Sequence, residues 1–251
     1  MNRKKPIVAG NWKMHKDTLE GISFASSVQA ELPKVDNVTV IYAPPFTGLF
    51  QLKVSPPYHK SAQNCHWEEK GAFTGETSVS MIKACGADYV IVGHSERREY
   101  YGETDGIVNK KISAILFEDL CPIFCIGETL KQRESGQTEN VLKKQICKGL
   151  KNIESLDSIV IAYEPVWAIG TGLTADVEQI EKAHSHIANV VSNLYEKINV
   201  RVLYGGSVNS NNANQLIKVP KVDGFLIGGA SLDVGSFSSI VQIVEDNEER
   251  K

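Results

Sequence analysis

The chain is poor in cysteine and lacks the spacings that mark metal centres or disulfide frameworks. Its five cysteines in 251 residues include no Cys-x-x-Cys pair, and none stands with the six histidines at the spacing of zinc ligands. An odd number of cysteines is typical of reduced thiols in a cytoplasm. We therefore expect no metal and no disulfide, and we interpret the cysteines mostly as packed apolar residues.

The sequence also lacks a long apolar run and an excess of basic residues. No segment approaches the ~18 apolar residues of a membrane span. The N-terminal MNRKKPIVAGNW has an apolar run that Gly10 and Asn11 interrupt, too short for a signal peptide. The net charge of −3 argues against a nucleic-acid partner. We expect a cytoplasmic protein that contacts neither membrane nor nucleic acid, so any anionic substrate must be attracted by a local site.

Short apolar or β-branched runs alternate with amphipathic stretches along the whole chain. The clearest helix carries apolar residues in steps of three and four from Val177 to Leu194, and Asp176 is placed to cap it. A second helical stripe covers residues 107–115. Eight strands are expected, at residues 6–12, 38–43, 60–64, 89–92, 121–126, 159–163, 201–204 and 224–227.

Eight strands that alternate with helices predict a parallel sheet covered by helices, because parallel strands need long crossovers. An open doubly wound sheet and a closed (β/α)8 barrel both satisfy this pattern. The first strand is not followed by GxGxxG, which weakens the dinucleotide-binding version of the open sheet. No linker or low-complexity tract divides the chain, so we expect one barrel domain over residues 1–251. Its active site should lie at the carboxyl ends of the strands.

Asn11 and Lys13 follow the first expected strand. An isolated lysine at a strand end is most often a solvated surface charge. It can also be a Schiff-base amine or a fixed positive charge for an anionic substrate, with Asn11 donating hydrogen bonds beside it. The pair alone does not decide between these interpretations.

His94 follows the fourth expected strand and precedes an expected helix start, in the polar run GHSERR. Backbone N–H groups at a helix start disfavour an additional proton on the imidazole. We therefore predict a neutral His94 that donates a hydrogen bond. A structural histidine with satisfied hydrogen bonds is the alternative.

Glu164 follows the sixth expected strand and is a candidate general base. The segment after it, 165–172, is apolar for a surface loop and is flanked by Pro165 and by Gly170 and Gly172. Such a loop suits a lid that closes over a substrate and excludes water. The alternative is a loop packed permanently on the barrel rim.

Glycine pairs follow the last two expected strands, in YGGS (204–207) and GGAS (228–231). Paired glycines expose backbone N–H groups that can hold a phosphate together with a short helix. Either pair alone is more often a turn. Both pairs together, at the two strands where barrels usually bind phosphate, favour a phosphate site.

Several motifs together resemble one known family. They are AGNWKM (9–14), QNC with GAFTGE (63–65 and 71–76), VGHSERR (92–98), CIGE (125–128), AYEPVWAIGTG (162–172), YGGSV (204–208) and DGFLIGGASL (223–232). The chain resembles the triosephosphate isomerase family over nearly its whole length. The resemblance implies a single (β/α)8 TIM barrel. The barrel, the acid–base pair and the lid are features for which this family is the standard example.

The resemblance implies an isomerase of glycolysis and gluconeogenesis that interconverts glyceraldehyde 3-phosphate and dihydroxyacetone phosphate through an enediolate, without cofactor or metal. By this resemblance Glu164 is the base and His94 the neutral electrophile, while Lys13 and Asn11 contact the substrate. Glu96 matches a glutamate close to the catalytic centre. The phosphate-binding positions match Gly170, Ser207, Gly228 and Gly229.

The resemblance also implies a homodimer, because Thr74, Gly75 and Glu76 match a loop that inserts into the partner subunit near Lys13. The chain departs from the family pattern at Leu173, where lysine is common at the far hinge of the lid. Asp176 is a second departure, although it keeps a capping side chain.

Two other functions remain open from the residues alone. One is a Schiff-base aldolase with Lys13 as nucleophile, although such a lysine is expected inside the barrel on a later strand. The other is a non-catalytic phosphate-binding barrel, against which the joint presence of Glu164, His94, Lys13 and Asn11 argues.

Overall fold

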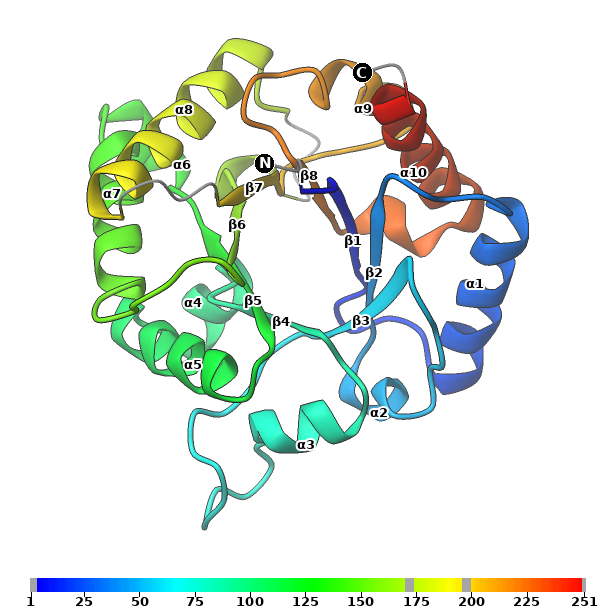
Figure 1. Cartoon of the computed structure of the whole chain (residues 1–251). Coiled ribbons are helices and arrows are strands. Elements are labelled where there is room, and N and C mark those ends of the chain that lie inside the picture. The colour runs from blue at the N-terminus through cyan, green and yellow to red at the C-terminus, as the bar shows by residue number, and fades with distance from the viewer. Residues whose placement is uncertain (1–3, 170–173, 196–199, 250–251) are drawn as a thin grey trace.

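Eight parallel strands form a closed barrel in sequence order, surrounded by helices (Figure 1). The structure is a computed structural model that describes residues 4–169, 174–195 and 200–249. The strands are β1 (Ile7–Asn11), β2 (Thr39–Ala43), β3 (Tyr58–Ala62), β4 (Tyr89–Val92), β5 (Cys121–Ile126), β6 (Val160–Tyr163), β7 (Arg201–Tyr204) and β8 (Gly224–Ile227). The (β/α)8 barrel expected from the sequence is confirmed.

The helices lie between the strands and cover the outside of the barrel (Figure 1). They are α1 (Thr18–Glu31), α2 (Phe46–Leu49), α3 (Val79–Ala84), α4 (Ser95–Tyr101), α5 (Asp105–Phe117), α6 (Leu130–Glu134), α7 (Thr138–Gly149), α8 (Val177–Leu194), α9 (Ala213–Leu216) and α10 (Val234–Glu249), with 3-10 turns η1 (Val166–Ala168) and η2 (Gly229–Leu232). Asp176 caps α8 as predicted: its Oδ1 accepts from the N–H of Gln179 at 2.8 Å.

The expected boundaries are confirmed at β4, β5, β7 and β8, and β3 is the main correction. That strand begins and ends two residues earlier than the expected 60–64. It ends at Ala62 because the next two side chains turn to other partners. Gln63 donates its amide to the carbonyls of Ala43 and Lys13, and the Asn64 side chain accepts from Lys111.

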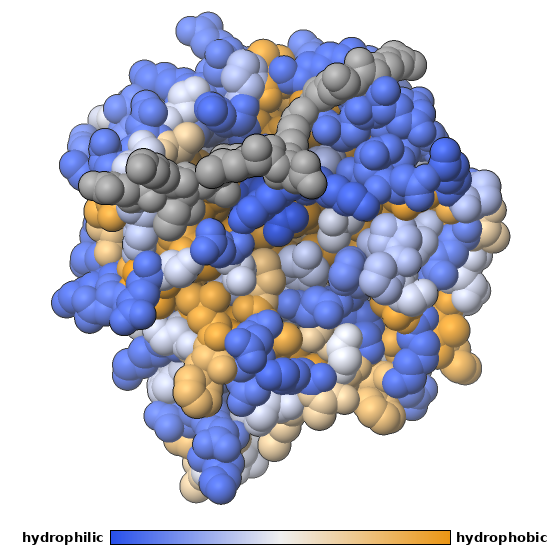
Figure 2. Space-filling model, in the orientation of Figure 1, coloured by the Kyte–Doolittle hydropathy of each residue, from blue (hydrophilic) through white to orange (hydrophobic). Residues whose placement is uncertain are grey.

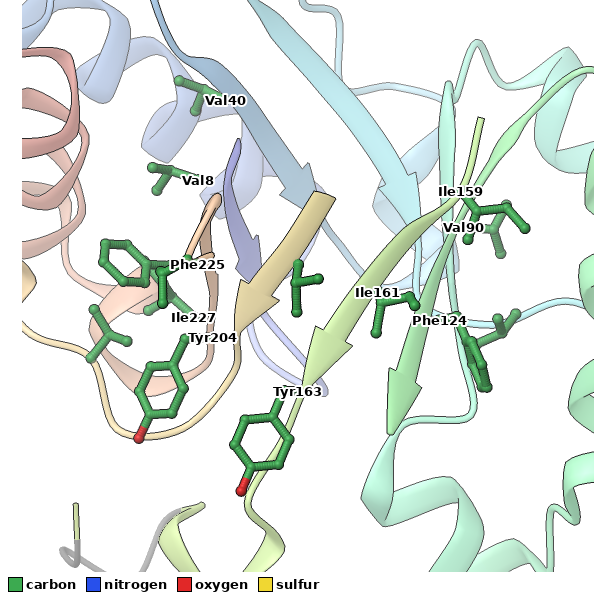
Figure 3. Packing of buried hydrophobic residues seen from close by; sticks show 14 of the residues in the cluster. Val8, Val40, Val90, Phe124, Ile159, Ile161, Tyr163, Tyr204, Phe225 and Ile227 are labelled. Carbon is green, nitrogen blue, oxygen red and sulfur yellow. The ribbon is translucent and has the colours of Figure 1, made fainter. Parts of the chain in front are cut away.

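Alternation along the strands divides the core into two layers. The inward side chains fill the barrel with a small apolar cluster: Ile7, Ala9, Ile41, Ala43, Tyr89, Ile91, Ile123, Cys125, Val160, Ala162, Leu203 and Leu226. The outward side chains, including Val8, Val40, Phe124 and Phe225, pack in the larger cluster that lies between strands and helices (Figure 3). Asn11 and Glu164 stand two residues beyond Ala9 and Ala162, so each continues an inward row at the carboxyl end of its strand.

The segment between β3 and α3 is the surface feature that bears on function. It projects beyond the ring of helices (Figure 1), and its residues 71–76 are exposed. Hydrophilic side chains cover much of the face in Figure 2, with hydrophobic patches between them. Among the described residues, no helix is both long enough and apolar enough to cross a membrane.

Candidate active site

A cavity of about 330 Å³ opens at the carboxyl ends of the strands. The predicted site residues that line it are Asn11, Lys13, His94, Glu164, Ser207, Gly228 and Gly229. Its wall also includes Ile169, Gly205, Gly206, Val208, Asn209, Leu226 and Ala230. Gly170 and Leu173 lie outside the described residues. Segments that follow β1, β4, β6, β7 and β8 thus meet around one small space, as the barrel rule predicts.

Glu164 and His94 face each other in this cavity. The Oε1 of Glu164 lies 3.1 Å from the Nε2 of His94, and both residues are buried, at 2% and 5% exposure. The other carboxylate oxygen, Oε2, accepts from the backbone N–H of Ser95 at 3.2 Å. The carboxylate is therefore held at two points while it stays on the cavity wall.

The hydrogen bonds of His94 define which ring nitrogen carries a proton. Its Nδ1 accepts from the backbone N–H of Glu96 at 3.2 Å, because His94 caps the start of α4. An N–H donor facing Nδ1 leaves that nitrogen unprotonated, so the proton of the neutral ring sits on Nε2. For the neutral ring predicted from the sequence, this geometry directs the Nε2–H toward the Oε1 of Glu164.

Lys13 reaches the same cavity from a strained backbone position. Its φ of 52° lies in the left-handed region, which residues other than glycine seldom adopt. Two hydrogen bonds hold this conformation: the Lys13 N–H donates to Asn11 Oδ1 at 3.1 Å, and its carbonyl accepts from Gln63 at 2.8 Å. The ammonium forms an ion pair with Glu96, with Nζ 2.5 Å from Oε1.

Glu96 does not line the cavity, although it touches two residues that do. Besides its ion pair with Lys13, its Oε2 lies 3.7 Å from the Nδ1 of His94. The side chain is 39% exposed, so solvent screens its charge more than that of the buried Glu164. Glu96 therefore contacts Lys13 and His94 from outside the cavity wall.

The glycine segments after β7 and β8 form another part of the cavity wall. A Cβ added at Gly229 would meet no atom within 4 Å, and one at Gly228 would first meet the Cε of Lys13 at 3.5 Å. Backbone N–H groups in such an open space can hold an anion. Ser207 donates its hydroxyl to the carbonyl of Ala168 at 2.8 Å, which joins the β7 loop to the segment after β6.

Two glycines pack directly on Glu164: Gly205, which belongs to a glycine pair predicted to bind phosphate, and Gly127, to which the sequence assigned no role. A Cβ at Gly205 would lie 2.9 Å from the Cγ of Glu164, and one at Gly127 would lie 1.7 Å from its carbonyl oxygen. Both glycines belong to motifs, YGGSV and CIGE, that carry the family resemblance. The motifs gave the signal, but only the fold shows that Gly205 borders the side chain of Glu164 and Gly127 its backbone carbonyl.

Glu128 is a second residue without an expected role. It is fully buried and accepts hydrogen bonds from Tyr163, Trp167 and Arg133, at 3.0–3.2 Å. Burial first, and then the Glu128 carboxylate, raise the pKa of Tyr163 well above its usual value, so the phenol remains a donor. Glu128 thereby fixes Trp167, at the start of the apolar segment predicted to be a lid.

The cysteines partly match the expectation of packed thiols. All five are free, with Cys65 and Cys125 buried and Cys85, Cys121 and Cys147 half-buried. Burial raises the pKa of Cys125, and the nearby Glu164 raises it further. Among the residues that the structure describes, no group of three or more His, Cys, Asp or Glu is placed to hold a metal ion.

Comparisons with known proteins agree with this geometry. The sequence model of one family, described as triosephosphate isomerase, matches residues 6–244. A triosephosphate isomerase of Endomicrobium trichonymphae is 47% identical over 246 residues, which cover 95% of this chain and 98% of that protein. Those of Chloroherpeton thalassium and Chlorobium phaeobacteroides are 46% and 48% identical, over 96% and 95% of this chain and 100% and 98% of their own lengths.

Proposed function

The chain belongs to the triosephosphate isomerase family, and from that premise we propose that it interconverts D-glyceraldehyde 3-phosphate and dihydroxyacetone phosphate, as a step of glycolysis and gluconeogenesis. The observation that carries the proposal is the 3.1 Å approach of Glu164 Oε1 to His94 Nε2 in a cavity that Lys13 also lines. A base, a neutral donor and a cation thus surround a space of about 330 Å³, which suits a small substrate.

Glu164 is the base in this proposal. The two substrates differ in the position of one carbon-bound proton, one hydroxyl proton and the associated carbonyl. Glu164 takes the proton from one carbon, which leaves an enediolate, and returns it to the next carbon, while the hydroxyl proton passes from one enediolate oxygen to the other. A positioned base typically contributes ~10²–10⁴-fold, so the oxyanion must also be stabilised.

His94 and Lys13 stabilise the developing negative charge. His94 donates through Nε2–H, since its Nδ1 accepts from the Glu96 backbone. Lys13 supplies a fixed positive charge, and Asn11 lies beside it. Donors that are held in place before the reaction need little reorganisation, which makes their stabilisation of an oxyanion effective.

We assign phosphate binding to Ser207, Gly228, Gly229 and Gly170. The last of these lies outside the described residues, as does part of the segment 165–172 that we propose as a lid. The phosphate does not react, so its binding energy is available to hold the lid closed. A closed lid excludes water and protects the enediolate from losing its phosphate.

We further propose that the active form is a cytoplasmic homodimer of single-domain chains. The exposed loop 71–76 projects from the barrel, which supports its insertion into a partner through Thr74, Gly75 and Glu76. Met14, next to Lys13, is 94% exposed, an unusual position for a large apolar side chain. Sedimentation equilibrium tests this point: a mass twice that of the chain is expected, and a monomer at micromolar concentration would refute it.

Two measurements separate the three functions that the sequence left open. The purified protein receives glyceraldehyde 3-phosphate without cofactor, and NMR follows the carbon signals. The isomerase accumulates dihydroxyacetone phosphate at catalytic protein concentration. A Schiff-base aldolase is instead inactivated by borohydride in the presence of substrate, and a non-catalytic barrel binds the substrate and leaves it unchanged. Either result would overturn the proposal.

A further inference from the structure

The first turn of α4 supports both side chains that face each other in the cavity. The backbone N–H of Ser95 donates to Glu164, and that of Glu96 donates to the Nδ1 of His94. These two residues are neighbours on one short helix of seven residues. Any shift of this turn therefore changes the position of the carboxylate and the orientation of the imidazole together.

Arg98, on the same helix, folds its side chain back beneath this turn. Its Nε donates to the carbonyl of Gly93 at 2.7 Å, and its Nη2 donates to the carbonyl of Cys125 at 3.2 Å. Its Nη1 forms an ion pair with Asp105 at 2.7 Å. One guanidinium thus ties α4 to the ends of β4 and β5 and to the start of α5.

The two carbonyl partners of Arg98 lie next to the reacting groups. The carbonyl of Gly93 belongs to the peptide bond that joins Gly93 to His94. Cys125 pairs with Ala162 in the barrel, two residues before Glu164. The charge of Arg98 also reaches the Cys125 thiol, since it opposes the rise in pKa that burial and Glu164 cause.

The fit around the guanidinium is close. Gly93 has a φ of 67°, and a Cβ there would lie 3.0 Å from Nη2 of Arg98 and from Val108. The Arg98 and Asp105 side chains are 19% and 13% exposed. The planar guanidinium carries five N–H donors and bonds all three acceptors at once. The ammonium of lysine is a single compact group, so it cannot bond the three acceptors in this geometry.

We propose that Arg98 is a positioning residue for the isomerisation: it fixes the first turn of α4 on β4 and β5, and this turn sets the His94 tautomer and the place of Glu164. The inference rests on the proposed function. It requires that His94 and Glu164 carry the reaction, and it adds that their alignment depends on a side chain that touches neither of them nor the substrate.

The test compares Arg98→Lys with Asp105→Asn. Lysine cannot bond both carbonyls in the geometry of the guanidinium, so the turn loosens. A misplacement of about 1 Å can cost ~10²-fold in rate, so we expect kcat to fall about 10- to 100-fold with KM within about twofold. Asparagine at 105 keeps an oxygen for Nη1 and removes only the charge, so Asp105→Asn should lower the unfolding temperature and leave kcat unchanged.

Nitrogen NMR of the His94 imidazole separates a positioning role from a purely structural one. A loss of stability alone would leave the imidazole resonances unchanged. In the wild type, His94 should show one tautomer with its proton on Nε2. In Arg98→Lys, the Nδ1 and Nε2 resonances should move toward each other, as the Glu96 N–H no longer holds a single tautomer. A variant with a lower unfolding temperature but wild-type kcat and wild-type imidazole resonances would overturn the proposal.

A second variant covers the case in which Arg98→Lys does not fold. The double change Arg98→Gln with Asp105→Asn replaces the ion pair with two neutral amides and leaves no unpaired buried charge. The same fall in kcat and the same change in the imidazole resonances are expected. A wild-type kcat together with wild-type imidazole resonances in this double variant would refute the inference. Inactive wild-type protein would instead refute the proposed function, so the two failures are distinguishable.

Discussion

The Nε2 of His94 lies 3.1 Å from the Oε1 of Glu164, although the two residues are 70 positions apart in the sequence and follow different strands. Each has its second polar atom occupied by a backbone N–H of α4: Nδ1 by Glu96 and Oε2 by Ser95. Nε2 and Oε1 are thus left to face each other at the cavity wall. A substrate that takes the place of this contact meets one donor and one acceptor, which is the requirement for moving a proton beside a carbonyl.

Shortening the base should slow turnover and preserve binding. Glu164→Asp retracts the carboxylate by about one methylene and keeps its charge, so the fold and the KM should change little. We expect kcat to fall about 100-fold or more, within the range that a positioned base contributes. Steady-state kinetics in both directions measure this, and near-normal turnover would exclude Glu164 as the base.

Removing the cation of the cavity should weaken binding of the anionic substrate. Lys13→Ala deletes the ammonium that lines the cavity, and a charged hydrogen bond of ~1.5–3 kcal/mol corresponds to roughly 10- to 100-fold in affinity. Lys53→Ala is the matched control, because Lys53 is an exposed lysine that donates to the carbonyl of Phe50 and does not line the cavity. Equal affinities in both variants would remove Lys13 from the binding site.

Adding one methyl group beside the base should displace it. A Cβ at Gly205 would lie 2.9 Å from Glu164 Cγ and 3.3 Å from the carbonyl of Tyr163, so Gly205→Ala pushes the carboxylate away. We expect kcat to fall ~10²-fold with the fold retained. Gly235→Ala is the control, since its nearest neighbour would be Asp233 Oδ1 at 3.7 Å in an exposed part of α10. Unchanged kcat in Gly205→Ala would mean that this contact does not position the base.

His184 is a fully buried histidine between two tyrosines. Its ring packs edge-on against Tyr163 and is tilted to Tyr204. Nδ1 donates to the carbonyl of Lys221 at 2.9 Å, while Nε2 has no hydrogen-bond partner among the described residues. Burial lowers the pKa of His184 from 6.5 to about 4, because an imidazolium in this site would lose its hydration.

This pKa predicts an acid-dependent loss of stability. Between pH 6.5 and about 4 the unfolded chain binds a proton at His184 that the folded chain does not, so stability falls as the pH falls through this window. The full contribution is about 3 kcal/mol. In His184→Asn, urea unfolding at fixed protein concentration should show a drop over this range that is smaller by about that amount.

The exposed His15 provides the control for this experiment. His15→Asn makes the same substitution outside the core and should follow the wild-type dependence on pH. If His184→Asn and the wild type lose the same free energy of unfolding between pH 6.5 and 4, His184 does not titrate in this way.

The order of strands and the cavity residues could be predicted because they depend on local patterns. Apolar runs of β-branched residues define strands, and polar or glycine residues directly after them must meet at one rim once the barrel closes. Asn11, Lys13, His94 and Glu164 all follow this rule. The predicted boundary of β3 was wrong: Gln63 and Asn64 lie beyond the strand, where their side chains bond to Lys13 and Lys111, partners that are distant in the sequence.

The residues that support the site could not be predicted from local sequence. Glu128, Arg98 and His184 are polar residues of ordinary helix and loop segments, and nothing near them shows that they are buried. Their positions follow from contacts over long sequence distances, such as Arg98 to Cys125 and His184 to Lys221. Such contacts exist only after the chain has folded.

The most direct test of the account is the transfer of solvent deuterium to substrate carbon. Wild-type protein is incubated with glyceraldehyde 3-phosphate in deuterated water, and NMR measures carbon-bound deuterium in the dihydroxyacetone phosphate. Because Glu164 exchanges its proton with solvent between the two transfers, the wild-type product should carry deuterium on the carbon that receives the proton. Glu164→Gln should give neither exchange nor product beyond the uncatalysed rate. Deuterium incorporation at equal rates in both proteins would contradict the account.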